Sequence, residues 1–206
     1  MTARGLLKTT IISPSCMHPL SVAMLFVTLL IAAPAFSTEL SAVLATSRVS
    51  PPASVAFQEE RHNPMFEQPL ILDGYLEYVG SGALRKVIES PFQEALSIEA
   101  GELLITRDGE THRLPVKRNK ALEALLGAFE ALLSGDDASL KAVFDHEVTG
   151  DISSWTIDLK PKSRRIGKHL SSLHVSGDSN GVSRILIRLH DGEWHAMNLR
   201  HEAPTL

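Results

Sequence analysis

Short stretches in which apolar and polar residues alternate follow one another through most of the sequence, and this alternation is its most constraining feature. A period of two indicates β-strands that bury one face. The predicted strands cover residues 55–61, 71–79, 83–89, 96–98, 103–105, 111–116, 145–151, 155–159, 171–176, 182–190 and 194–199. Short connections make neighbouring strands antiparallel, and a row of about ten twisted strands must curl, split or close on itself.

One strongly helical segment interrupts the strands, at residues 121–133. Large apolar side chains recur there at spacings of three and four, as in an amphipathic helix. They are Leu122, Leu125, Leu126, Phe129, Leu132 and Leu133. This stripe is too apolar to face water, so we expect the helix to pack on the concave face of the sheet. Gly135 fits a C-terminal cap, and shorter helices are predicted at 38–50 and 137–143.

These elements predict a fold that is mainly β with α. We expect a highly curved antiparallel sheet that forms an incomplete β-barrel, closed by a helical lid. The chain has 206 residues, a length that fits one domain besides any targeting segment.

The first 37 residues have the composition of a targeting segment. They carry Arg4 and Lys8 but no acidic residue, and residues 20–33 form an uncharged run of 14 apolar or small residues. Spanning a bilayer takes about 20 apolar residues, so this run fits a secretory signal peptide better than a membrane helix. We expect residues 1–37 to be a cleaved signal peptide and residues 38–206 to form a single domain. An uncleaved N-terminal anchor is the alternative.

Charge and cysteine content exclude several classes of protein. The chain has 20 Lys and Arg against 24 Asp and Glu, so it lacks the basic excess of a nucleic-acid binder. Its one cysteine, Cys16, precedes the apolar run, whereas a lipidated cysteine would follow it. Cys16 therefore leaves with the signal peptide, and the mature chain suits an oxidising compartment.

Enzyme signatures are missing from the sequence. There is no Gly-x-Ser-x-Gly, Gly-x-Gly-x-x-Gly, phosphate loop or His-Glu-x-x-His. The adjacent acids of 59–60 point to opposite sides of a strand, so they do not form an acid/base pair. The histidines lack metal-ligand spacing. We expect neither an enzyme nor a metal site, and no cofactor.

Six segments, taken in order, carry a family resemblance. They are residues 57–61, 74–78, 84–91, 132–136, 155–161 and the closing strand around 185–187. Their order and spacing across essentially the whole mature chain resemble a LolA-related branch of the LolA-type outer-membrane lipoprotein carriers. The resemblance implies a periplasmic protein of Gram-negative bacteria. In such a protein an apolar cavity in an incomplete barrel receives the acyl chains of a lipoprotein.

The resemblance also implies a function and partners. The expected function is to shield the acyl chains of a lipoprotein or lipid and to carry that molecule between the inner and the outer membrane. A donor exporter in the inner membrane would supply it, and an acceptor at the outer membrane would receive it. The cargo is a lipoprotein or another acylated lipid, with glycolipids and polyene-type lipids left open. We expect a monomer that binds no nucleic acid. The alternative is an envelope interaction or sensor module of the same fold that binds lipids or proteins without transporting them.

Alternation and the helical stripe together supply candidates for the cavity wall. They are Leu72, Leu76, Tyr78, Leu84, Ile88, Leu96, Ile98, Leu103, Ile105, Leu125, Phe129, Trp155, Ile157 and Leu159. The same side chains would also fill an ordinary closed core, and the pattern alone does not separate the two.

One departure from the archetypal carriers concerns an arginine. Those carriers have an Arg-Pro pair ahead of the third strand, and that Arg helps to lock the lid. Aligning residues 74–76 and Pro91 without gaps puts Gly80 and Ser81 at that position. Arg61, Arg85 and Lys86 are candidates for a cation that meets a lipid head group or phosphate. The alternative is that all three are solvated strand residues.

Overall fold

A computed structural model describes residues 39–80 and 83–200, so the predicted signal peptide lies outside the described residues. The described residues belong to one compact unit, Ala35–Leu206. Its strands are β1 (Ala53–His62), β2 (Leu70–Gly80), β3 (Ala83–Ser90), β4 (Glu94–Glu99), β5 (Glu102–Arg107), β6 (Glu110–Pro115), β7 (Phe144–Asp151), β8 (Ser154–Pro161), β9 (Leu170–Asp178), β10 (Gly181–Leu189) and β11 (Trp194–Arg200). Its helices are α1 (Leu40–Ser47), α2 (Lys120–Ser134), α3 (Asp137–Val143) and α4 (Arg164–Gly167), with a 3₁₀ turn at Val116–Arg118.

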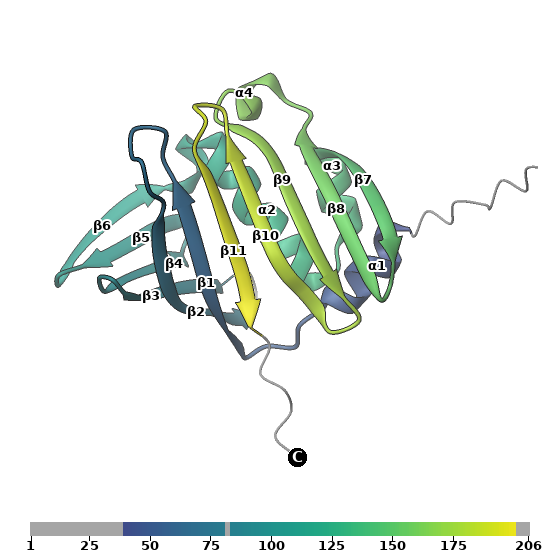
Figure 1. The fold of residues 1–206 in the computed structure, drawn as a ribbon, viewed down its shortest axis with the longest axis horizontal. Helices are drawn as coiled ribbons and strands as arrows, with labels where there is room; N and C mark the ends of the chain where they lie inside the picture. The colour runs from purple at the N-terminus through teal and green to yellow at the C-terminus, as the bar shows by residue number, and fades with distance from the viewer. Residues whose placement is uncertain (1–38, 81–82, 201–206) are drawn as a thin grey trace, which may run out of the picture. The chain divides into compact units, whose positions relative to one another are not determined.

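All 11 strands form a single antiparallel sheet in the order β6-β5-β4-β3-β2-β1-β11-β10-β9-β8-β7 (Figure 1). Strands that follow one another in sequence are paired, except β6 and β7, between which α2 and α3 intervene. The first and last strands, β1 and β11, also pair, which places Phe57 opposite Leu199. Strands β6 and β7 are the two edges, so the sheet of the described residues is not closed. The predicted fold class, an open curved antiparallel sheet with helices, is confirmed.

The helices gather on one face of the sheet, where α2 lies beside α1 and α3 (Figure 1). The side chain of Asn119 caps α2 by accepting hydrogen bonds from the amides of Ala121 and Leu122, both at 3.1 Å. Gly135 ends the helix with a left-handed φ of 73°, a conformation that glycine adopts at little cost. The sequence therefore sets both ends of α2.

One part of the packed core is formed by α1, α3 and the strands next to them. Leu44 of α1, Leu140 of α3 and Phe144 at the start of β7 are almost fully buried there, together with Trp155 of β8. The indole Nε1 of Trp155 donates to the carbonyl of Asp178 at 3.0 Å, so the ring lies against the end of β9.

Gly177 makes room for that ring. A Cβ at this position would lie 2.1 Å from the carbonyl oxygen of Gly181 and 2.4 Å from Cζ2 of Trp155. Neither the turn backbone nor a fully buried indole can move aside easily. Gly127 in α2 is the opposite case, because a Cβ there would meet nothing within 4 Å.

We therefore expect opposite effects from two glycine substitutions. Gly177→Ala should lower the free energy of unfolding by about 2 kcal/mol, as overpacking does. Gly127→Ala should raise it by roughly 0.5–1 kcal/mol, because alanine favours the helix. Urea unfolding followed by circular dichroism measures both, and equal effects would contradict this account of the Trp155 site.

Candidate functional site

A cavity of about 690 Å³ lies between the sheet and α2. Ligand-binding cavities typically measure about 300–1,000 Å³. Strands from both halves of the sheet form its wall, with α2 and the segment that joins α1 to β1 on the other side. The lining is dominated by leucine, isoleucine and valine, so the space suits an apolar ligand.

The side chains of α2 explain why the protein does not fill this space itself. Its fully buried residues are mainly small: Ala124, Ala128 and Ala131 bring α2 close to its neighbouring helices. Leu122, Leu125, Leu126 and Phe129 are only partly buried, and all four line the cavity. Large apolar side chains of α2 thus border the cavity while also packing against the edge of the core.

Eight of the candidate cavity residues lie in this wall. They are Leu76, Tyr78, Leu84, Leu96, Ile98, Leu103, Leu125 and Phe129. They come from β2, β3, β4, β5 and α2, which meet here because consecutive strands of the antiparallel sheet lie side by side. Their role in binding stays a prediction.

The structure places the other six candidates away from the cavity wall. Leu72, Ile88, Trp155, Ile157 and Leu159 are at most 1% exposed and belong to the packed core. Strand β8, which carries three of these residues, lies on the side of the sheet that α1 and α3 cover (Figure 1). Ile105 is partly buried on β5 and is not part of the wall. Alternation identified the inward face of the sheet but not which part of it the helices fill.

Sequence reasoning missed the wall residues from the last two strands. They are Val182, Ile185, Ile187, Met197 and Leu199. The same alternation in residues 182–190 and 194–199 was the available signal. What was lacking was the pairing of β1 with β11, which brings these strands around to the cavity.

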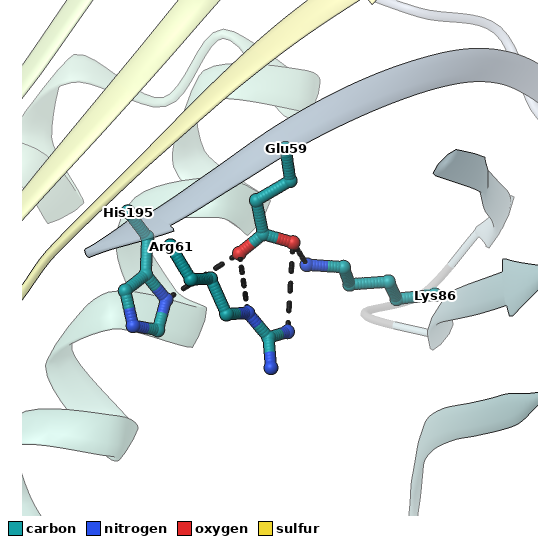
Figure 2. Close-up of polar contacts among 4 residues, drawn as sticks. All are labelled: Glu59, Arg61, Lys86 and His195. Atoms are coloured by element: carbon teal, nitrogen blue, oxygen red, sulfur yellow. Dashed lines mark hydrogen bonds and ion pairs between the residues drawn. The ribbon is translucent and has the colours of Figure 1, made fainter. Parts of the chain in front are cut away.

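Four charged or titratable side chains form a cluster in the wall: Glu59, Arg61, Lys86 and His195 (Figure 2). The Oε1 atom of Glu59 lies 3.0 Å from Nε of Arg61 and 3.4 Å from Nδ1 of His195. Its Oε2 atom accepts from the ammonium group of Lys86 and, at 3.5 Å, from Nη2 of Arg61. These contacts join β1, β3 and β11 through one carboxylate.

The cluster holds Glu59 in its charged form. Burial raises the pKa of this carboxyl, but the hydrogen bond from His195 and the charges of Lys86 and Arg61 outweigh burial and bring the pKa well below its ordinary value. Burial lowers the pKa of Lys86, although Glu59 opposes that change. The ammonium group also lies 4.8 Å from the centre of the Phe57 ring, a cation–π distance.

The three candidate cations do not share one environment: two line the cavity and one lies outside it. Arg61 and Lys86 belong to the cavity wall, with 27% and 16% of their side chains exposed. Arg85 points to the other face of β3 and pairs with Glu77 at 2.9 Å, with 45% of its side chain exposed. Arg85 thus fits the solvated alternative, whereas Arg61 and Lys86 do not.

The described residues contain neither a metal-binding cluster nor a helix suited to a membrane. No group of three or more His, Cys, Asp or Glu in residues 39–80 and 83–200 is arranged to hold a metal ion. None of the helices in these ranges has both the length and the apolar character needed to cross a membrane.

The protein thus belongs to the class with an open antiparallel sheet, helices on one face and an apolar cavity between them. The chain belongs to the family of LolA-like outer membrane lipoprotein carrier proteins, whose model matches residues 32–203. This match confirms the family expected from the sequence. No curated protein matches the chain.

Several solved structures are similar to the chain. A LolA superfamily protein from Nitrosomonas europaea is 10% identical, with a TM-score of 0.42 over 82% of this chain and 96% of the other. Lipoprotein LppX from Mycobacterium tuberculosis is 12% identical, with a TM-score of 0.41 over 81% and 96%. A chain of the MucA/MucB complex from Pseudomonas aeruginosa is 12% identical, with a TM-score of 0.43 over 82% of this chain but only 59% of that one.

The buried carboxylate predicts an acid-sensitive contribution to stability. Because the pKa of Glu59 is lowered by folding, its contribution is complete above the ordinary carboxyl pKa of about 4.3 and is lost as the pH falls below it. Glu59→Gln should lower the free energy of unfolding at pH 7 by about 3 kcal/mol, since Lys86 loses its anion. The difference from the wild type should begin to shrink at about pH 5 and should continue to shrink as the pH falls well below the ordinary carboxyl pKa.

Glu60→Gln is the matched control for that measurement. Glu60 is the next residue of β1, on the opposite face of the strand, and its substitution should change stability by less than about 0.5 kcal/mol. Denaturant unfolding at several pH values gives both results. A Glu59→Gln difference that stays constant with pH would contradict the assigned role.

Proposed function

We propose that this protein binds the acyl chains of a lipoprotein or lipid in its cavity and carries that molecule between the inner and the outer membrane. The observation that carries the proposal is the hollow itself, an apolar space bordered by the partly buried leucines of α2. The family description, which names carriers of outer membrane lipoproteins, supports it. The proposal includes export to the periplasm, with residues 1–37 as the cleaved signal peptide.

The size of the cavity is sufficient for an acyl chain. A water molecule takes about 30 Å³ of liquid and a methylene group is of similar size, so 690 Å³ gives space for roughly twenty methylene groups. Each buried methylene contributes about 0.8 kcal/mol relative to water. The protein can therefore keep such a chain out of the aqueous space between two membranes.

The same arithmetic shows why the carrier needs partners. The free energy of an acyl chain changes little when the acyl chain moves from a bilayer into an equally apolar cavity, because both environments exclude water. Capture and delivery thus require a donor at the inner membrane and an acceptor at the outer membrane. The cavity keeps water away from the acyl chain, and these partners determine from which membrane to which the ligand moves.

An acyl chain can enter the cavity without breaking the backbone hydrogen bonds between the strands. Side chains of α2 form one side of the cavity, and α2 packs mainly on the other helices. At its C-terminal end it accepts two hydrogen bonds from the segment after α1, from the amide of Val49 at 3.0 Å and from Nε of Arg48 at 3.1 Å. A small displacement of α2 about this end would widen the space while the strands stay paired.

Direct detection of a ligand tests the proposal. The full chain is expressed with its signal peptide, purified from the periplasm without detergent and analysed by native mass spectrometry for bound lipid. A fluorescent fatty acid is then titrated into the delipidated protein. We expect bound lipid and saturable uptake; the absence of both would favour a module that ferries nothing.

Filling the cavity provides a structural test. We expect Leu76→Trp combined with Leu125→Trp to weaken fatty-acid binding about tenfold, or about 1.4 kcal/mol, because both residues line the cavity. Stability should stay unchanged or rise, since the added rings enter empty space. Val79→Trp is the control on β2, because Val79 is 62% exposed.

The stability measurement decides between a hollow and a packed core. In a packed core the same two substitutions would cost about 1–3 kcal/mol each. A strong loss of stability, or unchanged uptake in a folded variant, would contradict the assignment of this space to the ligand.

A further inference from the structure

The polar cluster in the cavity wall has more positive than negative charge. Glu59 supplies one carboxylate, and Arg61 and Lys86 supply two cations. The charge of Glu94 also acts on Lys86, but Glu94 lies 4.0 Å from Arg107, so counting this second pair leaves the same surplus of one positive charge. Arg48 also lines the cavity, but it is exposed and donates to the carbonyl of Ser134.

The cluster also has more donors than acceptors. Arg61 uses Nε and Nη2 for Glu59, and its Nη1 makes no hydrogen bond to any residue that the structure describes. Figure 2 shows this terminal nitrogen pointing away from the carboxylate. The ammonium group of Lys86 carries three N–H groups, and among the described residues it donates only to Glu59. Both side chains line the cavity, so free donors border the space.

A charge surplus beside an apolar space is costly unless it has a partner. Both cations are largely withdrawn from water, with 27% and 16% of their side chains exposed. Two buried cations that share one carboxylate are only partly compensated, which is unfavourable away from water. An anion brought in by the ligand would supply the missing counter-charge and hydrogen bonds, and a guanidinium group matches the geometry of carboxylate and phosphate oxygens.

We propose that Arg61 and Lys86 bind the anionic group, a carboxylate or a phosphate, of a ligand whose acyl chain occupies the cavity. This inference rests on the proposed function and names its ligand class, an anionic amphiphile instead of a neutral one. Glu59 is a positioning residue, since its carboxylate holds both cations at the wall. His195 contacts Glu59 from β11 and orients that carboxylate from the other side of β1.

Pairs of ligands with the same chain but different head groups test the inference. Palmitate is compared with hexadecanol, and palmitoyl lysophosphatidic acid with monopalmitin, by displacement of a fluorescent fatty-acid probe from the wild-type protein. We expect the anionic member of at least one pair to bind about tenfold more tightly, the effect of one charge-assisted hydrogen bond. The pair that shows the larger preference identifies the carboxylate or the phosphate as the group bound.

Variants of neighbouring residues give the matched control. Arg61→Gln and Lys86→Gln should each bring the ratio of anionic to neutral affinity towards one, because the anionic ligand loses more affinity than the neutral one. Arg85→Gln should leave the ratio at its wild-type value, because Arg85 precedes Lys86 on β3 but faces away from the cavity. Thermal unfolding followed by circular dichroism identifies variants that do not fold.

Three results overturn the inference. Equal affinities within both pairs in the wild type would remove the anion preference, even though chain binding and the proposed function would stand. A folded Lys86→Gln or Arg61→Gln variant with an unchanged ratio would remove these cations from the site. Equal loss of neutral and anionic ligands in such a variant would make the cluster structural only. Failure of every ligand to bind the wild type would instead overturn the proposed function.

Discussion

The pairing of β1 with β11 is the contact on which the rest of the structure depends. It joins the half of the sheet that precedes α2 to the half that follows it, with Glu59 opposite Met197 and Arg61 opposite His195. Without it the molecule would consist of two separate meanders, neither of which lines the whole cavity. Because strands twist and coil, a continuous sheet of 11 strands curves, and the space on its concave face is available to a helix or to a ligand.

Helix α2 decides how that space is shared. Its alanines allow close packing against the neighbouring helices, and its leucines are directed over the cavity. A helix with large residues on both sides would stand farther from its neighbours and fill the hollow. The division of α2 into a small-residue seam and a leucine face therefore matters as much as its overall apolar character.

The regular elements of this fold were readable from the sequence because each depends on local patterning. The alternation predicted the strands, and the three-four spacing with Gly135 predicted α2. Leu72 and Leu76 show where that reasoning ends: they are the same residue type on the same face of β2, yet Leu72 is buried in the core and Leu76 borders the cavity. The difference comes from how the rest of the chain packs on this face of the sheet, which the pattern of one strand does not describe.

The polar cluster shows a second limit. Nothing in the residues around Glu59 indicates that its partners come from Lys86 and His195, because strand pairing over long sequence separations brings them together. The short helix α4 was not predicted either, since Arg164–Gly167 is too brief to have a helical period.

The cluster also has a consequence for the cavity when no ligand occupies it. A wholly apolar cavity excludes water when no ligand occupies it. Closure of its walls would therefore be favourable, because it restores van der Waals contacts. Arg61 and Lys86 oppose that closure, because their exposed parts would lose water without gaining a new partner. The two cations beside Glu59 therefore favour an open cavity when no ligand occupies it.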